Sequence, residues 1–333
     1  MKPIAYFREI VHTLPKLARA TGHSTARLYL SFLRLYLCFH VQLEEFQAMH
    51  LYDFSNQKMS EILTERRRAK QARVFNADAT PEDYALFNEK HRFNAFFHDY
   101  VHRDWLYLPE AAPAEVEEFA YQHPVFLAKA DVGTQGRGIR LFRPGEYAPE
   151  ELADVFAGQN ILLEAFILQH PDMAALNPAS VNTVRIVSAQ LGGKVLLVGA
   201  CLRVGDRGPV DNFHQGGVAY PIDLSTGIVD GPGRTLMGRA EFIRHPSTDH
   251  VMPGFAIPHW DMLCSAVETA ALMSPHIGYI GWDVSVTAEG IELIEGNVNS
   301  PDPVVIQLDD RGVYPALRRF IADNQRPLRD GTE

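Results

Sequence analysis

The hydrophobic positions near the start of the chain follow a helical period. Between Leu28 and Phe39, apolar side chains recur at spacings of three and four residues, as they do along one face of an α-helix. This run is too short to span a bilayer, and it contains Arg34. Arginine and lysine then crowd into 65–73, where a solvated helix face is expected and a polyanion or membrane-surface patch is the alternative. We therefore predict a helical N-terminal region over residues 1–75.

After residue 75 the pattern changes to short hydrophobic runs that are separated by turn and capping residues. Thr80 followed by Pro81 predicts the start of a helix, and another helix is expected over 114–121. The hydrophobic runs that predict strands are 125–130, 138–142 and 161–166. We predict that residues 76–167 form a small α+β lobe.

The remaining part, residues 168–333, is richer in strands. Gly192-Gly193 separates two long apolar runs and predicts a hairpin turn. The predicted strands are 180–190, 194–204, 217–222, 227–229, 279–286 and 291–295, and the predicted helices are 260–273 and 314–323. The predicted fold class is therefore α+β, with two α+β lobes that follow a helical region.

Composition narrows the class of protein. Of the 333 residues, 46% are hydrophobic and 22% are charged, which is typical of a soluble globular protein. The net charge of −10 argues against a general nucleic-acid surface. The three cysteines are far apart without metal-ligand spacing, as in a reducing compartment, and the N-terminus lacks a signal-peptide pattern. We expect a cytoplasmic protein with no nucleic-acid partner and no transmembrane segment; peripheral membrane contact and the oligomeric state stay open.

A glycine-rich turn follows the predicted strand that carries Lys129. A flexible loop of this kind lets backbone N–H groups approach phosphate oxygens, and a lysine beside it adds a cation. The residues of the turn that could take part are Gly133, Thr134, Gln135, Gly136 and Gly138. A simple hairpin is the alternative, since the spacing matches neither a P-loop nor a dinucleotide fingerprint.

Two further segments could hold an ATP molecule. The run ILLEAFI has one interior carboxylate, and Glu164, Ala165, Phe166 and Ile167 could offer an apolar slot and a backbone edge to adenine. An edge-strand glutamate facing water is the alternative for Glu164. Arg185 and Arg203 lie among apolar residues on neighbouring predicted strands, so they indicate either an anion site or structural salt bridges. Asn212, in a polar turn that ends in two glycines, could contact phosphate or metal.

The strongest group of candidate ligands is Asp283, Glu295 and Asn297. Strand alternation puts Glu295 and Asn297 on one face, and Asp283 on the preceding hairpin arm can face them. Clustered carboxylates repel one another unless a cation lies among them, and oxygen ligands suit Mg²⁺. An acidic hairpin surface is the alternative. The histidines His91, His98 and His102 recur on a helix but complete no zinc motif.

Taken in order, these segments resemble the ATP-grasp superfamily across about Phe87 to Leu308. The words QHP, SVNTVRI, DNFHQGG and GWDVSV are most similar to the sugar-transfer-associated ATP-grasp group, and DNFHQGG also resembles ribosomal-protein S6 glutamate-ligase-like members. The resemblance implies that Lys90 and Lys129 bind phosphates, that GTQGRG covers the triphosphate and that LLEAFI is the adenine hinge. It also implies that Arg185 and Arg203 surround the transferred phosphate, and that GWD and IEGN supply the metal ligands.

The resemblance further implies an activity. It predicts an ATP- and Mg²⁺-dependent carboxylate–amine ligase with two metal ions, for which Mn²⁺ is an alternative, acting on small-molecule carboxylate and amine substrates in surface-polysaccharide or related biosynthesis. Two alternatives stay open: a small-molecule or sugar kinase of the same fold, and a nucleotide-binding scaffold. Many ATP-grasp ligases begin with a Rossmann-like domain, whereas residues 1–75 are predicted to be helical.

Overall fold

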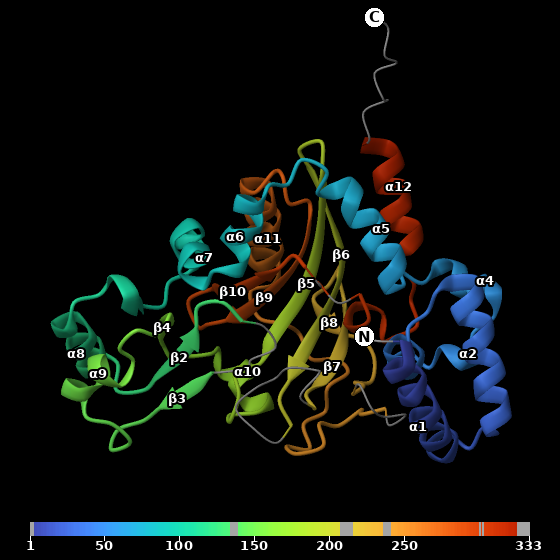
Figure 1. The fold of residues 1–333 in the computed structure, drawn as a ribbon, viewed down its shortest axis with the longest axis horizontal. Coiled ribbons are helices and arrows are strands. Elements are labelled where there is room, and N and C mark those ends of the chain that lie inside the picture. The colour runs from blue at the N-terminus through green and yellow to red at the C-terminus, as the bar shows by residue number, and fades with distance from the viewer. Residues whose placement is uncertain are drawn as a thin grey trace, which may run out of the picture.

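The computed structural model describes residues 3–133, 139–206, 216–235, 241–299, 301 and 303–324. It has a small lobe at one end, a large sheet in the middle and a group of helices at the other end (Figure 1).

The N-terminal region is helical, as predicted. Its α-helices are α1 (Pro3–Thr21), α2 (Thr25–Phe39), α3 (Leu43–Ala48), α4 (Asn56–Glu61) and α5 (Glu65–Phe75). Side chains cap several of them: Ser24 accepts a hydrogen bond from the backbone N–H of Arg27, and Thr64 accepts one from that of Arg67. Among the described residues, no helix combines the length and the hydropathy needed to cross a membrane.

The small lobe is built on a four-stranded antiparallel sheet within the described residues. Its strands are β1 (Trp105–Tyr107), β2 (Phe126–Ala130), β3 (Arg140–Phe142) and β4 (Ile161–Ala165), in the order β1-β4-β2-β3, and its main helices are α8 (Pro113–Gln122) and α9 (Leu152–Val155). Phe126 and Phe142 stack at 5.0 Å in the core that joins sheet and helices. Strand β1 was not predicted, because three residues are too few to show an alternating pattern.

The large lobe is built on a six-stranded antiparallel sheet, again counting described residues only. The strands are β5 (Thr183–Leu191), β6 (Lys194–Val204), β7 (Val218–Asp223), β8 (Ile228–Val229), β9 (Tyr279–Val286) and β10 (Ile291–Asn297), in the order β10-β9-β5-β6-β7-β8. The predicted glycine hairpin joins β5 to β6, and Gly192 and Gly193 both have positive φ (62° and 75°), which glycine adopts without strain.

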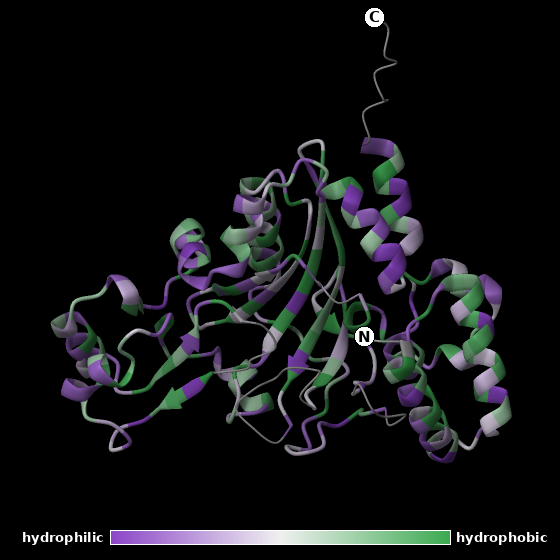
Figure 2. Cartoon of the chain, in the orientation of Figure 1, coloured by the Kyte–Doolittle hydropathy of each residue, from purple (hydrophilic) through white to green (hydrophobic). Residues whose placement is uncertain are grey.

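Both faces of this large sheet are covered. On one face, α11 (Trp260–Met273) packs with α6 (Pro81–Asn88) and α7 (Lys90–Phe96), and α10 (Pro171–Leu176) adds to the same core. On the other, the N-terminal helices pack with α12 (Tyr314–Asn324). The interior strands are mainly hydrophobic, with a few hydrophilic bands, as Figure 2 shows, because each side contacts a different core. The N-terminal region is therefore one cover of the large sheet.

Two short helices before the small sheet pack against the large one. Phe87, Phe93 and Phe97 lie in the core of the large lobe, where their rings surround Trp282. Helices α6 and α7 therefore pack with the large lobe, although they fall within the predicted small lobe of 76–167. Their hydrophobic positions show that they are buried, but the period of a short helix does not reveal which sheet it covers.

Helix α5 is less solvated than the sequence predicts. Arg68 is buried and pairs with Glu65. Arg67 donates hydrogen bonds to two backbone carbonyl oxygens, and its guanidinium lies 4.6 Å from the ring centre of Tyr314. These two arginines hold α5 in place, so the expected solvated face is reduced to Arg66, Lys70 and Arg73.

Candidate active site

Strand register in the large sheet brings three charged side chains into one row. Asp283 on β9 is paired with Arg185 on β5 and with Glu295 on β10. Residues that are directly opposite each other on neighbouring strands point to the same face of the sheet. A register shift between Leu293 and Glu295 separates the regular part of β10 from this end of the strand. The row therefore runs across β9, from Arg185 on β5 to Glu295 on β10.

Asp283 is held by two guanidinium groups. Arg185 forms a two-pronged pair with it, which includes a 3.0 Å bond from Nη2 to Oδ2, and Arg203 Nη2 lies 3.1 Å from the same oxygen. Burial raises the pKa of Asp283, but the charges of Arg185 and then Arg203 more than offset it, so its pKa lies well below the usual value. Arg203 also donates from Nε and Nη2 to Thr183 Oγ1, at 3.0 and 2.7 Å.

Glu295 completes the row, and its pKa is shifted in the opposite direction from that of Asp283. Burial and then the neighbouring Asp283 raise its pKa, while Arg185 and Asn297 act against this shift. Asn297 Nδ2 donates to Glu295 Oε1 at 3.1 Å. Two facing carboxylates beside an amide form the oxygen-rich donor set that a hard cation such as Mg²⁺ prefers.

Lys90 connects this row to the small lobe. At the start of α7, its ammonium donates hydrogen bonds of 3.1 Å to the backbone carbonyl oxygens of Ala130, Asp131 and Gly133. Burial lowers the pKa of Lys90; Glu295 opposes the shift and Lys129 adds to it. The pKa of Lys90 therefore depends on charged groups of both lobes, and its hydrogen bonds attach it to the beginning of the glycine-rich turn.

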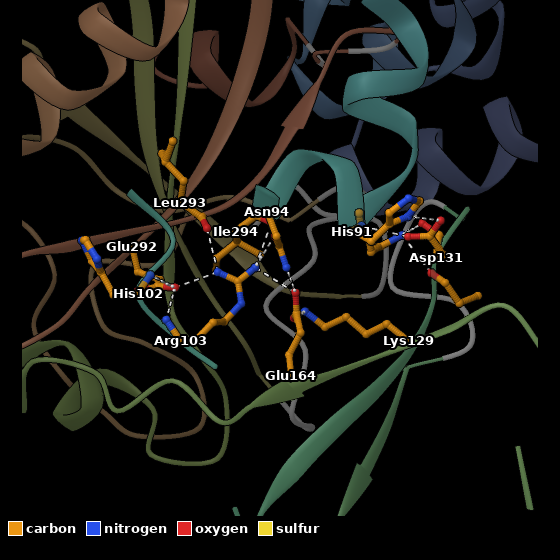
Figure 3. Close-up of polar contacts among 12 residues, drawn as sticks. His91, Asn94, His102, Arg103, Lys129, Asp131, Glu164, Glu292, Leu293 and Ile294 are labelled. Carbon is orange, nitrogen blue, oxygen red and sulfur yellow. Dashed lines mark hydrogen bonds and ion pairs between the residues drawn. The ribbon is translucent and has the colours of Figure 1, made fainter. Parts of the chain in front are cut away.

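Glu164 and Lys129 form a second charged cluster in the small lobe. Figure 3 shows Glu164 lying between Lys129 and Arg103. Lys129 pairs with Glu164, and Arg103 Nη2 donates to Glu164 Oε1 at 2.8 Å. Burial raises the pKa of Glu164, but Arg103 and then Lys129 outweigh it and hold the pKa well below its usual range. Strand β4 lies between β1 and β2, so the alternative of a solvent-facing edge glutamate is wrong.

Arg103 is a residue that sequence reasoning missed. Besides Glu164, it contacts the large lobe: Nη1 donates to Glu292 Oε1 at 2.7 Å and to the backbone oxygen of Leu293 at 2.8 Å. Asn94 supports the cluster by donating to Glu164 and accepting from Arg103. Arg103 thus ties β4 of one sheet to β10 of the other. It stands in a short polar segment, HRDW, with no apolar run or motif that marks it.

The histidines that the sequence showed on one helix do not come together. His91 bonds to Asp131 through its backbone N–H and through Nδ1, both at 2.9 Å, and its ring stacks on Tyr107 at 4.0 Å. Glu89 lies beside this pair, and the three residues could offer ligand atoms within 4.8 Å of one another. His98, by contrast, is exposed and pairs with Asp99. The hydrogen bonds of Asp131 indicate that this group fixes the strand end before the glycine-rich turn.

Several predicted residues lie elsewhere or outside the described part. The residues outside it are Thr134, Gln135, Gly136, Gly138 and Asn212. Gly133 is described, and its carbonyl oxygen accepts from Lys90. The backbone N–H of Ala165 donates to the carbonyl oxygen of Asp104 at 2.8 Å, while Phe166 and Ile167 follow β4 and are half-buried. A cavity of about 400 Å³ lies against α8 and α9, and none of the charged site residues lines it.

Known proteins supply the context for this arrangement. Solved structures similar to the chain include the ATP-grasp ligase PsnB with Mg, ADP and a variant of its minimal precursor (13% identity, 78% of this chain, 69% of that chain, TM-score 0.45). Another is biotin carboxylase from Campylobacter jejuni (13% identity, 74% of this chain, 48% of that chain, TM-score 0.47). No curated protein sequence matches the chain. A model of the sugar-transfer associated ATP-grasp family matches residues 152–321, just over half of the 333 residues. The chain therefore belongs to the sugar-transfer associated ATP-grasp family, with the α+β fold that its sequence predicts.

Proposed function

We propose that the protein is an ATP- and Mg²⁺-dependent ligase that activates a carboxylate as an acyl phosphate and transfers the acyl group to an amine. The observation that carries the proposal is the row Arg185–Asp283–Glu295, with Lys90 close enough to respond to Glu295. In this proposal the arginine of the row contacts phosphate oxygens and its two carboxylates bind the metal ion. Family membership supports ATP as the phosphate donor.

The donor set fits magnesium. Asp283, Glu295 and Asn297 present carboxylate and amide oxygens at one end of β9 and β10, and burial and then the facing Asp283 raise the pKa of Glu295. A bound divalent ion supplies neutralisation of the phosphate charge during transfer. In this site the arginines fix Asp283, and Asn297 fixes Glu295. The metal ligands are thereby positioned in advance.

The two lysines have distinct roles in this proposal. Lys129 extends from β2 and pairs with Glu164. Lys90 is anchored on the carbonyl oxygens that precede the glycine-rich turn. Burial lowers the pKa of Lys90, so the triphosphate would stabilise its charged form. Both lysines bind phosphate oxygens, and Glu164 to Ile167 contribute the adenine side of the site.

The reaction then takes two steps. An oxygen of the substrate carboxylate attacks the γ-phosphorus, the bond to the β,γ-bridging oxygen breaks, and ADP leaves. The amine nitrogen attacks the acyl carbon, loses a proton, and inorganic phosphate leaves. Arg185 and Arg203, with Asn212, stabilise negative charge on the transferred group. Because an acyl phosphate hydrolyses, closure over the site must keep water out. Because the family is described as sugar-transfer associated, we propose an acceptor in surface-polysaccharide or related biosynthesis.

The experiment that tests the proposal is a trap for the acyl phosphate. The protein is incubated with ATP, Mg²⁺ and a panel of carboxylic acids, with and without hydroxylamine in place of the amine. A ligase gives ADP and a hydroxamate that depends on the acid. A stable phosphate ester on a hydroxyl acceptor would show a kinase instead, and nucleotide binding without turnover across broad panels would point to a scaffold.

A further inference from the structure

Helix α2 has two hydrophobic faces, and only one of them is covered by the protein. Leu28, Phe32 and Leu35 are buried in the core beneath the large sheet. Leu30, Leu33 and Leu37 lie on the opposite side and are 70%, 53% and 64% exposed. Their spacing of three and four residues makes a continuous apolar stripe. A helix that is apolar on both sides is expected to meet an apolar environment on both.

Helix α1 also exposes apolar side chains, along one side that becomes buried toward its C-terminal end. Ile4, Phe7 and Val11 are 72%, 65% and 45% exposed, whereas Leu14 and Ala18, one heptad after Phe7 and Val11, are buried. Two arginines lie beside these apolar residues. At about 100° per residue, Arg8 and Arg19 are displaced from Ile4 by roughly 40° and 60° around the helix axis. Both arginines are exposed. The exposed side of α1 is therefore an apolar stripe with a basic border, the pattern of a helix that lies in a membrane interface.

The two helices form one unit at the end of the molecule that is farthest from the small lobe (Figure 1). They follow each other directly and pack together, and Tyr29 Oη lies 3.5 Å from the carbonyl oxygen of Val11. Hydrophobic residues run along both of them in Figure 2. Isolated apolar side chains on a surface are ordinary, but a row of them along one helix, such as Leu30, Leu33 and Leu37, marks an interaction site.

The charge of helices α1 and α2 indicates which kind of partner would bind their exposed apolar side chains. Between residues 3 and 39, five Lys and Arg residues stand against one Glu, a formal charge of +4, although the whole chain carries −10. A second copy of the hairpin would bring an equal positive charge against the first. An anionic lipid surface offers the opposite charge together with an apolar layer, and Lys and Arg side chains can extend toward the headgroups.

We propose that α1 and α2 form a docking element that lies in the interface of an anionic lipid bilayer. Ile4, Phe7, Leu30, Leu33 and Leu37 enter the boundary between headgroups and acyl chains, and the basic border contacts lipid phosphates. Since neither helix can cross the bilayer, the attachment is peripheral and reversible. This proposal goes beyond the catalytic function and does not depend on it, because it concerns a different surface and can be tested without nucleotide.

The first experiment measures sedimentation with vesicles of phosphatidylcholine mixed with phosphatidylglycerol, and with vesicles of phosphatidylcholine alone. The wild-type protein should bind the anionic vesicles, and added salt should weaken binding. The variant Leu30→Glu/Leu33→Glu/Leu37→Glu should lose roughly a hundredfold or more of its partitioning. The matched control is Met262→Glu/Leu272→Glu, which places glutamates at two exposed apolar positions of helix α11 and should bind as the wild type does.

The second experiment separates the electrostatic part. Arg8→Gln/Arg19→Gln should lower binding to anionic vesicles by roughly tenfold and weaken its salt dependence. All variants should keep the wild-type melting temperature, because the changed side chains are exposed. The proposal is overturned if the monomeric wild-type protein does not sediment with anionic vesicles. It is also overturned if the wild type is a dimer that the triple glutamate variant converts to a monomer while neither binds lipid, since the leucines would then serve self-association.

Discussion

The protein contains two buried carboxylates that each pair with two cationic side chains but differ in their other polar neighbour. Glu164 lies between Arg103 and Lys129, and Asp283 lies between Arg185 and Arg203. In both cases burial raises the pKa and two cations more than reverse the shift. Around Glu164 the remaining neighbour is a neutral amide, that of Asn94. Around Asp283 it is another carboxylate.

Strand β10 shows this difference within four residues. Glu292 is buried against Arg103 and belongs to the first cluster, whereas Glu295 faces Asp283 and belongs to the second. The first cluster spans the two sheets and balances its charge internally, so we interpret it as a clamp between the lobes. The second also holds two arginines and two carboxylates, but its carboxylates face each other, and burial and then Asp283 raise the pKa of Glu295. The comparison teaches that two facing carboxylates distinguish a candidate cation site from a clamp in which a cation lies between the carboxylates.

The largest expected effect comes from Glu295→Gln. The change removes one metal ligand but leaves Asp283 with both arginines, so ATP turnover should fall by about three orders of magnitude. The melting temperature should stay the same or rise, because the repulsion between Glu295 and Asp283 is gone. Turnover and thermal unfolding are measured on the same preparation.

The control for this variant is Glu292→Gln on the same strand. It removes the negative charge that pairs with Arg103, so it should lower stability while the folded protein keeps most of its turnover. Equal loss of turnover in the two variants, or a stability loss in Glu295→Gln, would contradict the division into clamp and cation site.

Next in size is the effect of Glu164→Gln on stability. The amide keeps the shape of the side chain but leaves Arg103 and Lys129 without their shared anion, so the free energy of unfolding should fall by about 3 kcal/mol in urea titrations. Glu61→Gln is the control, since Glu61 pairs with Lys58 at the surface and should change stability by less than about 0.5 kcal/mol. Unchanged stability would contradict the role of Glu164 in the clamp, whatever the effect on ATP binding.

The sequence allowed most of the large lobe to be predicted. Strand alternation is long enough in β9 and β10 to place Asp283, Glu295 and Asn297 on one face, and the structure brings these residues together. The predicted strands and helices of residues 180–324 agree with the observed ones to within a few residues. Their roles in metal binding and catalysis stay predictions.

The clamp could not be predicted, for a physical reason. Arg103 acts through contacts with residues that are 61 and 189 positions away, and neither its own neighbours nor any periodicity encodes those pairings. The same holds for α6 and α7, which are recognisable as buried helices but not assignable to one lobe. Likewise, the basic sequence of α5 predicts a solvated helix face, and only tertiary packing shows that Arg67 lies over Tyr314.

A smaller effect is expected from pH on metal binding. The folded-state pKa of Glu295 is above its usual 4.5, so protonation of Glu295 stabilises the fold; that contribution is complete below about 4.5 and disappears as the pH rises through the raised value. Mg²⁺ competes with this proton. The increase in melting temperature caused by Mg²⁺ should therefore grow with pH, with affinity changing up to about tenfold per unit below the raised pKa.

Two variants test the assignment of this pH dependence. In Glu295→Gln the response to Mg²⁺ should be weak and nearly independent of pH, and in Glu164→Gln it should keep the wild-type slope. The pKa shifts of Glu164 and Asp283 have the opposite sign, because both pKa values are lowered. Their stabilising contribution is therefore present above their usual pKa values of 4.5 and 3.8, and it is lost as the pH falls through the folded-state values. A Mg²⁺ response that weakens toward neutral pH would contradict the proposed ligand.

The smallest expected effect concerns the orientation of Arg203. Thr183→Val removes the hydroxyl that accepts two bonds from its guanidinium but leaves the contact with Asp283. We expect kcat to fall by about fivefold, KM for ATP to change little, and stability to decrease by about 1 kcal/mol. Ser188→Ala is the matched control on the same strand, because Ser188 accepts a buried hydrogen bond from Trp282 and its loss should cost similar stability without lowering kcat. Thr183→Ser should restore kcat. If both variants lowered kcat alike, Thr183 would serve the strand as a whole and the position of Arg203 would be set by Asp283 alone.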